Sequence, residues 1–371
     1  MKTPAPSLER ALELARETRA VGVRRDGKGR VLFTYLYPSP ELFALPEGRE
    51  LRGIVYREDG SLLSRPFYKF FHYEEPPWGL KREEFTGPVL LGEKLDGYLL
   101  QVFLDGEELV LASRHSLNPP LVGKVASRLW GEEVEREARA FLSEVPATLL
   151  FEVIDPEVPV LVRYPKPRLA LICARDLDTG AYLFPERDFP WKGERVRWEE
   201  RQLDPGAFHE EVARLEGLEG FVAYLPERGE FVKFKANWAF RLAEFLKDPA
   251  GRFLQAYVQD TVDDLLGALG GREDLGRAVL EARKRLDGVY LEAVELGNSL
   301  RELPRKEAWE RAVEEARKHG TLAPAFAEAA MGAFGGGEPR KKFLFALERG
   351  GRGRAFLEGL SLFPRVGEAR E

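Results

Sequence analysis

Cysteine is almost absent from this chain. The single Cys173 among 371 residues excludes a disulfide framework and any zinc site that needs several cysteines. It lies in the apolar run 169–173, which favours a buried structural thiol. No apolar run approaches the ~20 residues that a membrane helix needs, so no membrane role is expected. The first residues lack the apolar core of a signal peptide, which predicts a cytoplasmic protein.

Basic residues are in a slight minority, with 56 Lys and Arg against 62 Asp and Glu and a net charge of −6. Proteins that bind nucleic acid without sequence preference are usually basic, so such a role requires a local basic groove. Asparagine is also rare and occurs only at positions 118, 237 and 298. This scarcity of thermolabile residues indicates a thermophilic source, although a GC-rich genome produces the same bias.

The sequence pattern changes near residue 240, from short β-rich runs to helical periodicity. Ser7 is a suitable N-cap for a helix that reaches Arg19. Residues 21–235 then form short β-rich runs with one helical stretch at about 122–143. Asp-Gly pairs between these runs predict hairpin turns at 26–27, 59–60 and 105–106.

After Trp238, apolar residues recur at helical spacing. Glycines interrupt the pattern at 270–271 and 335–337, and we expect helices near 274–296, 304–318 and 322–333. The predicted fold class is α+β. Residues 1–240 form antiparallel sheets flanked by helices, and residues 241–371 form an all-helical domain.

Lys94 follows the apolar strand 89–91 in the pattern Glu93-Lys94-Leu95-Asp96-Gly97. A protonated lysine is a poor nucleophile, but in a pocket lined with other cations its pKa falls and its amine can attack. Gly97 lets the backbone turn tightly beside a nucleotide. The alternative is that Lys-x-Asp-Gly forms only another hairpin turn.

Lys233 and Lys235 alternate with Val232 and Phe234, so both lysines share one strand face. Two ammonium groups this close repel each other unless an anion such as a triphosphate lies between them. A solvated edge strand that carries lysines against aggregation is the alternative.

Carboxylates interrupt two apolar strands, Glu152 in 149–154 and Glu219 in 218–222. A buried acid needs a partner such as a ribose hydroxyl, a metal-bound water or a lysine, whereas an exposed one needs none. Arg52 precedes an aromatic run at 67–71, which suits phosphate contact with base stacking. Ordinary core aromatics beside a salt-bridged arginine would give the same pattern.

The order Arg52, Lys94, Glu152, Glu219, Lys233 and Lys235 resembles the covalent nucleotidyltransferase superfamily of ligases and capping enzymes. Lys-x-Asp-Gly, Phe-Glu, Glu-Gly-Phe-Val and Lys-x-Lys match its motifs I, IIIa, IV and V. Further segments are similar to the phage RNA ligase 1 family, and within it to the thermophilic phage single-strand ligases used to circularise RNA and single-stranded DNA. These segments lie at 33–37, 51–54, 69–71, 113–116, 235–238, 262–265 and 362–366.

The resemblance implies a role for each matching residue. Lys94 would be the adenylated nucleophile, and Glu219, Lys233 and Lys235 would be catalytic. The predicted ATP-binding residues are Tyr35, Arg52, Lys69, Phe71, Glu93, Lys94, Gly97, Glu152, Lys233 and Lys235. Of these, Glu152 would hold the ribose and the two motif V lysines the phosphates. Asp263 and Glu219 would serve a Mg²⁺ ion, with Mn²⁺ as a substitute. Leu95 and Arg114 depart from the family, which carries an acid and commonly a lysine there.

The resemblance thus implies an ATP-dependent ligase that joins 5′-phosphate and 3′-hydroxyl ends of single-stranded RNA, and also of single-stranded DNA. It would act as a monomer in the host cytoplasm if phage-encoded, and tRNA repair is the role that the family implies. A DNA ligase or capping enzyme would continue with a β-barrel, but this chain continues with helices. A kinase P-loop is absent. The rival from another class is a non-enzymatic RNA-binding protein whose basic segment 340–354 contacts RNA.

Overall fold

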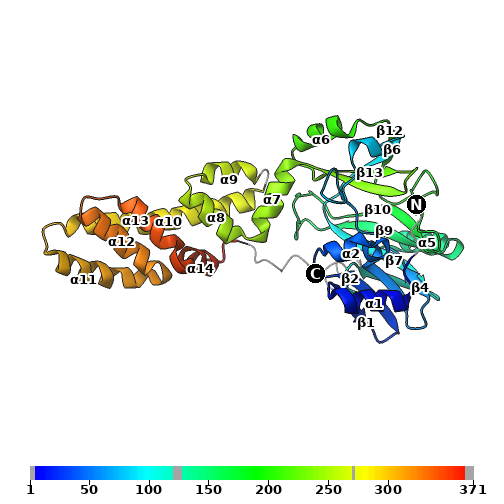
Figure 1. Cartoon of the computed structure of the whole chain (residues 1–371), viewed down its shortest axis with the longest axis horizontal. Helices are drawn as coiled ribbons and strands as arrows, with labels where there is room; N and C mark the ends of the chain where they lie inside the picture. Colours follow the sequence, from blue (N-terminus) through cyan, green and yellow to red (C-terminus); the bar gives the residue numbers. More distant parts are fainter. Residues whose placement is uncertain (1–4, 120–127, 270–271, 364–371) are drawn as a thin grey trace. The chain divides into compact units, whose positions relative to one another are not determined.

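The computed structural model describes residues 5–119, 128–269 and 272–363 (Figure 1). They form two compact units, the first ending at Ala239 and the second beginning at Phe240. The first combines sheets with helices and the second is helical, which confirms the predicted α+β class. The expected break at 270–271, the start of the helix expected at 122–143 and residues 364–366 of the last family segment lie outside the described residues.

Sheet A is an antiparallel meander. Its strands, in spatial order, are β1 (Val21–Arg25), β2 (Arg30–Tyr35), β3 (Arg52–Arg57) and β4 (Leu62–Ser64). The turns predicted at 26–27 and 59–60 connect its hairpins. An apolar cluster joins it to α1 (Leu8–Thr18) and α2 (Pro40–Ala44), and α3 (Pro46–Glu50) leads into β3. Ser7 caps α1 as predicted, because its hydroxyl accepts a hydrogen bond from the Arg10 N–H at 3.1 Å.

Sheet C is the central layer. Its order is β11 (Tyr182–Leu183), β10 (Arg168–Asp176), β9 (Ala147–Ile154), β7 (Tyr98–Asp105) and β8 (Glu108–Ser113). The turn predicted at 105–106 joins β7 to β8. One face packs against α5 (Glu132–Glu144), which lies beside the sheet in Figure 1. The other face meets sheet A through Phe103 and sheet B through Leu150 and Cys173. Cys173 is fully buried, as its apolar run predicts.

Sheet B carries the motif strands. Its order is β12 (Trp198–Arg201), β6 (Val89–Glu93), β13 (Gly220–Leu225), β14 (Glu230–Lys235) and β5 (Phe71–His72), with the short helix η1 (Arg82–Glu84) before β6. Val232 and Phe234 pack under α6 (Pro205–Ala213) on the outer face. Phe231 packs toward sheet C, so Lys233 and Lys235, which share its face by strand alternation, also point between the two sheets.

The second unit is built on a long helix, α10 (Glu273–Ser299), that packs against α12 (Ala323–Phe334). At Gly297 the helices approach closely, because an added Cβ would lie 2.1 Å from the Ala330 carbonyl oxygen. The helices predicted near 274–296, 304–318 and 322–333 are confirmed. Among the described residues, no helix has both the length and the apolar character needed to cross a membrane. The remaining elements are α7 (Asn237–Lys247), α8 (Pro249–Val258), α9 (Val262–Ala268), α11 (Arg305–Ala316), η2 (Arg317–Leu322), α13 (Pro339–Glu348), η3 (Arg349–Gly351) and α14 (Arg352–Gly359).

Candidate active site

A cavity of about 590 Å³ lies among the three sheets of the first unit. Sheet B supplies Val222 and Phe231, and sheet C supplies Leu99 and Ile172. Six of the residues predicted from the motifs line it: Arg52, Glu93, Lys94, Gly97, Glu152 and Lys233. The motif segments are far apart in the chain, and residues from several of them meet at this one cavity.

Lys94 lies just past the end of β6 and contacts the carboxylate of Glu219. Its backbone N–H donates to the Gly220 carbonyl oxygen at 2.9 Å, which continues the pairing of β6 with β13. Glu219 is buried, and its other oxygen lies 3.1 Å from Lys235 Nζ. Glu219 and Lys235 thus stand next to the nucleophile, although neither lines the cavity.

The expected fall in the pKa of Lys94 is not found. Burial acts to lower the pKa, but the carboxylates of Glu219 and Glu152 outweigh it and hold the pKa above its ordinary value. The groups nearest the amine are acids rather than the cations that we anticipated. Lys94 is therefore an ammonium group that has to lose a proton before it attacks.

Two further acids lie near Lys94: Asp96, which is buried, and Glu152, which is half-buried. Glu152 Oε1 accepts a hydrogen bond from the Gly97 N–H at 2.8 Å, and burial raises the pKa of Glu152 to about 7 although Lys94 opposes the shift. Asp96 accepts from the N–H groups of Leu161 and Val162 at 2.5 and 2.6 Å, and burial raises its pKa to about 6. At Gly97 any Cβ would lie 2.3 Å from the Val153 carbonyl oxygen, so only glycine fits.

Lys233 shows the low pKa that was expected for Lys94. Burial lowers the pKa of Lys233 well below its ordinary value, and Lys69, Arg52 and Lys94 add to the shift. Its Nζ donates to the Phe70 carbonyl oxygen at 3.2 Å. The amine therefore needs an anion beside it to hold its proton, which a phosphate in the cavity would provide.

Arg52 and Arg114 line another wall of the cavity, and Tyr35 lies behind this wall. Arg114 lies over the Tyr35 ring at 5.0 Å, and its Nη1 donates to the Tyr35 hydroxyl at 3.2 Å. Burial acts to raise the pKa of Tyr35, but Arg52, Arg114 and Lys69 together lower it. Arg114, where the family commonly carries a lysine, thus lines the cavity in front of Tyr35.

Three further predicted residues, Lys69, Phe71 and Asp263, are not among those that line the cavity. Lys69 Nζ lies 4.5 Å from the centre of the Phe71 ring, and Phe71 stacks on Trp78 in the core beside sheet A. Asp263 belongs to the helical unit, where its exposed carboxylate lies 3.2 Å from Arg283 Nη1. Lys69 and Phe71 thus lie outside the cavity lining within the first unit, and Asp263 belongs to the other unit.

The apolar wall was predicted only in part, through the aromatic run at 67–71. Aromatic and aliphatic side chains line the cavity beside the charged ones: Phe67, Phe70, Leu99, Ile172, Val196, Trp198, Val222 and Phe231. A flat base can pack against such a wall, as in most nucleotide pockets. Phe67 and Phe70 belong to that run, and strand alternation from Lys233 to Phe231 is a further sequence signal for this wall.

The carboxylates near the cavity suit a Mg²⁺ ion that is held largely by substrate phosphates. Among the described residues, no three His, Cys, Asp or Glu side chains gather into a metal-binding group. Mg²⁺ is commonly held by one or two carboxylates together with substrate phosphates. Glu219 lies beside the cavity and could be one of these carboxylates.

Known proteins match this chain along most of its length. The family model described as RNA ligase matches residues 50–242. RNA ligase 1 of bacteriophage TS2126 is 53% identical, over 98% of this chain and 94% of its own. The chain belongs to the phage RNA ligase 1 family. The predicted enzyme class, an ATP-dependent RNA ligase, is confirmed with it.

Among solved structures, an archaeal ATP-dependent RNA ligase is similar with a TM-score of 0.47 and 19% identity, over 76% of this chain and 78% of that one. The family assignment rests on the sequence match with the phage ligase. The rival interpretation, a non-enzymatic RNA-binding protein, loses its support, because the motif residues converge on one cavity in a ligase family member.

Proposed function

We propose that this protein joins a 5′-phosphate to a 3′-hydroxyl of single-stranded RNA through an AMP carried on Lys94. The contact of Lys94 with Glu219, at a cavity that Arg52 and Lys233 also line, is the observation that supports this most directly. The amine lies where positive charge and an apolar wall could hold a nucleotide. ATP is the substrate that fits both features.

The first step forms the bond between Lys94 Nζ and the α-phosphorus of ATP and breaks the bond to the β-phosphate oxygen. Pyrophosphate leaves, and the Lys94 ammonium group gives up two protons to solvent as the bond to phosphorus forms. Binding of the triphosphate raises the pKa of Lys233, so that Lys233 can take up a proton as the cavity fills. Arg52, Lys233 and Lys235 are the cations proposed to offset the phosphate charge.

The second and third steps use the same cavity. An oxygen of the RNA 5′-phosphate attacks the phosphorus of the lysyl-AMP, and the bond to Lys94 breaks. A 3′-hydroxyl then attacks the activated 5′-phosphorus, and AMP leaves as the new phosphodiester forms. A bound divalent cation would offset phosphate charge, with Glu219 and Asp263 as its proposed carboxylates. For the remaining rate enhancement, positioning by the protein is the main source.

Glu152 is proposed to face the ribose. Because burial raises its pKa to about 7, a fraction of Glu152 carries a proton at neutral pH and can donate as well as accept a hydrogen bond. Glu93 and Gly97, which line the cavity on either side of Lys94, would contact the nucleotide through their backbones.

Incubation with α-³²P-ATP and Mg²⁺ tests the proposal. Wild-type protein should become labelled, and peptide mapping should place the label on Lys94. Lys94→Ala should remain unlabelled. Lys284→Ala, which changes an exposed lysine of α10, is the matched control and should label normally. Labelling of Lys94→Ala at the wild-type level would refute the nucleophile.

A 5′-phosphorylated oligonucleotide then tests the joining steps. The wild-type protein should convert RNA into circles or concatemers through an adenylated intermediate. Single-stranded DNA, tRNA repair, the monomeric state and a cytoplasmic location are further parts of this proposal, which the family resemblance supports. The same holds for an adenylyltransferase domain at 1–240 and an all-helical domain at 241–371, which the two compact units support.

A further inference from the structure

We propose that Gln101 is a positioning residue for ATP, which acts by holding Arg52 and Arg114 side by side. The proposal rests on the function proposed above and adds a residue that cannot reach the ligand. Gln101 lies within the central strand β7 and is fully buried. Its side chain leaves β7 on the face that meets sheet A.

The amide group of Gln101 connects the backbones of two strands. Its Nε2 donates to the Gly53 carbonyl oxygen and to the Ser113 carbonyl oxygen, each at 2.9 Å. Gly53 directly follows Arg52, and Ser113 directly precedes Arg114. The opposite orientation of the amide would place its oxygen against two carbonyl oxygens, so this one is required.

A β-bulge explains why Gly53 needs this partner. The register of β2 with β3 passes from the pair Phe33–Ile54 to the pair Thr34–Arg52, which leaves Gly53 without a paired residue on β2. Gly53 has φ +96°, and an added Cβ would lie 3.1 Å from Arg114 Cα. Bulges redirect the neighbouring side chain, and here the neighbour is Arg52.

The two arginines next to these backbone contacts, Arg52 and Arg114, both line the cavity. Arg52 Nη1 is buried and has no hydrogen-bond partner among the described residues, which indicates a ligand atom as its partner. Arg114 is held over Tyr35. Because two guanidinium groups repel each other, their backbones have to be fixed if both are to contact one anion.

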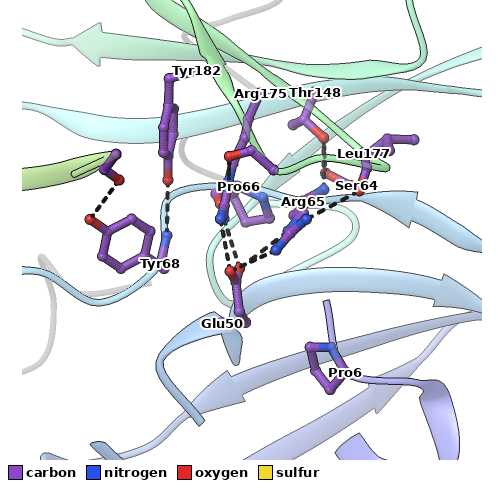
Figure 2. Close-up of polar contacts among 12 residues, drawn as sticks. Pro6, Glu50, Ser64, Arg65, Pro66, Tyr68, Thr148, Arg175, Leu177 and Tyr182 are labelled. Carbon is purple, nitrogen blue, oxygen red and sulfur yellow. Dashed lines mark hydrogen bonds and ion pairs between the residues drawn. The ribbon is translucent and has the colours of Figure 1, made fainter. Parts of the chain in front are cut away.

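A buried polar chain fixes Gln101 itself. Ser64 Oγ donates to Gln101 Oε1 at 2.7 Å and lies 3.0 Å from Thr148 Oγ1, which accepts from the Arg65 N–H at 2.8 Å. Figure 2 shows Ser64, Thr148 and Arg65 in this arrangement, with Arg65 reaching Glu50. The amide therefore has a single orientation.

Full-length Gln101→Met tests the proposal by ATP–pyrophosphate exchange. Methionine keeps the length of the side chain and removes both donors. We expect the KM for ATP to rise roughly tenfold, as loss of two hydrogen bonds implies, with kcat within about threefold of wild type. Tyr56→Phe is the matched control, because it removes a buried hydrogen bond, to the Pro6 carbonyl oxygen, that lies outside the polar chain around Gln101. It should lower the melting temperature without changing the KM.

A double variant separates positioning from a general loss of stability. If Gln101 acts through the arginine pair, Gln101→Met should raise the KM less in Arg114→Ala than in the wild type. An unchanged KM in Gln101→Met, an equal rise in Tyr56→Phe, or full additivity with Arg114→Ala would each overturn the proposal. Absence of exchange in the wild-type protein would overturn the proposed function instead, a result distinct from an active variant with normal KM.

Discussion

The backbone N–H of Lys94 donates to the carbonyl oxygen of Gly220 at 2.9 Å, and this contact aligns the Lys94 side chain with the carboxylate of Glu219. Lys94 directly follows β6 and Glu219 directly precedes β13, so the pairing of these two strands places the predicted nucleophile beside its acid.

Glu219→Gln should make the Lys94 amine more reactive toward small reagents. The variant removes a negative charge that stabilises the ammonium form, so the pKa of Lys94 falls. At a fixed mildly alkaline pH, each unit of that fall raises the neutral fraction about tenfold. The measurement is the rate of Lys94 modification by an amine-specific reagent, followed by mass spectrometry. Glu227→Gln changes a surface acid bonded to Thr86 and should leave the rate unchanged. An unaltered rate in Glu219→Gln would mean that Glu219 does not hold the proton on Lys94.

ATP binding should take up protons because of Lys233. Burial and the neighbouring cations hold the pKa of Lys233 well below its ordinary value, so phosphates beside the amine would raise this pKa and favour uptake of a proton. Calorimetry without divalent cations, in two buffers of different ionisation enthalpy, measures the uptake before any chemistry. Lys233→Met should bind ATP more weakly and take up fewer protons. His72 and His115, with pKa values of about 3 and about 4, are neutral neighbours whose substitution provides the comparison. Equal uptake by Lys233→Met and wild type would contradict this account.

Glu50→Gln should unfold more easily by about 3–5 kcal/mol, because the variant breaks a buried ion pair and leaves its cations in the core. Glu50 is 3% exposed and binds both Arg65 and Arg175, the latter at 2.7 and 2.8 Å (Figure 2). Chemical denaturation measures the change. Glu199→Gln, which alters an exposed pair with Arg201, should cost no more than about 1 kcal/mol.

The pH dependence of Glu50 has a defined sign. Burial acts to raise its pKa, but Arg175 and Arg65 outweigh burial and lower it below the ordinary value of 4.5. A lowered pKa means that this stability is present above about pH 4.5 and is lost as the pH falls through the folded-state pKa. The difference between wild type and Glu50→Gln should therefore shrink in acid. A constant difference would show that the charge of Glu50 is not its source.

Local patterns were sufficient for much of the fold. Asp-Gly turns, the Ser7 cap and the helical periodicity after Trp238 depend on neighbouring residues alone, so the sequence contains them. The pKa of Lys94 depends on which distant charges meet it. That is decided by the register of β6, β9 and β13, which periodicity does not determine.

For Gln101, the sequence shows that the side chain needs hydrogen-bond partners but not which groups these are. A glutamine within the apolar strand 98–104 can be recognised as a buried polar residue that needs partners. Its partners, the carbonyl groups of Gly53 and Ser113, depend on a bulge and on a contact between two sheets. Neither feature has a signal in the sequence around Gln101.

Asp263→Asn should slow formation of the lysyl-AMP without lowering the melting temperature. Asp263 lies in the first turn of α9 with its side chain 86% exposed, so its loss removes little packing and one surface ion pair with Arg283. If this carboxylate helps to hold a hydrated Mg²⁺ ion, added Mg²⁺ should restore much of the rate, since mass action offsets the weaker site. The measurement is the initial labelling rate with α-³²P-ATP across a Mg²⁺ titration. Asp264→Asn changes the adjacent exposed acid and is the matched control, which should follow the wild-type titration. Superimposable titrations for both variants would remove Asp263 from the metal site and leave Glu219 as its proposed carboxylate.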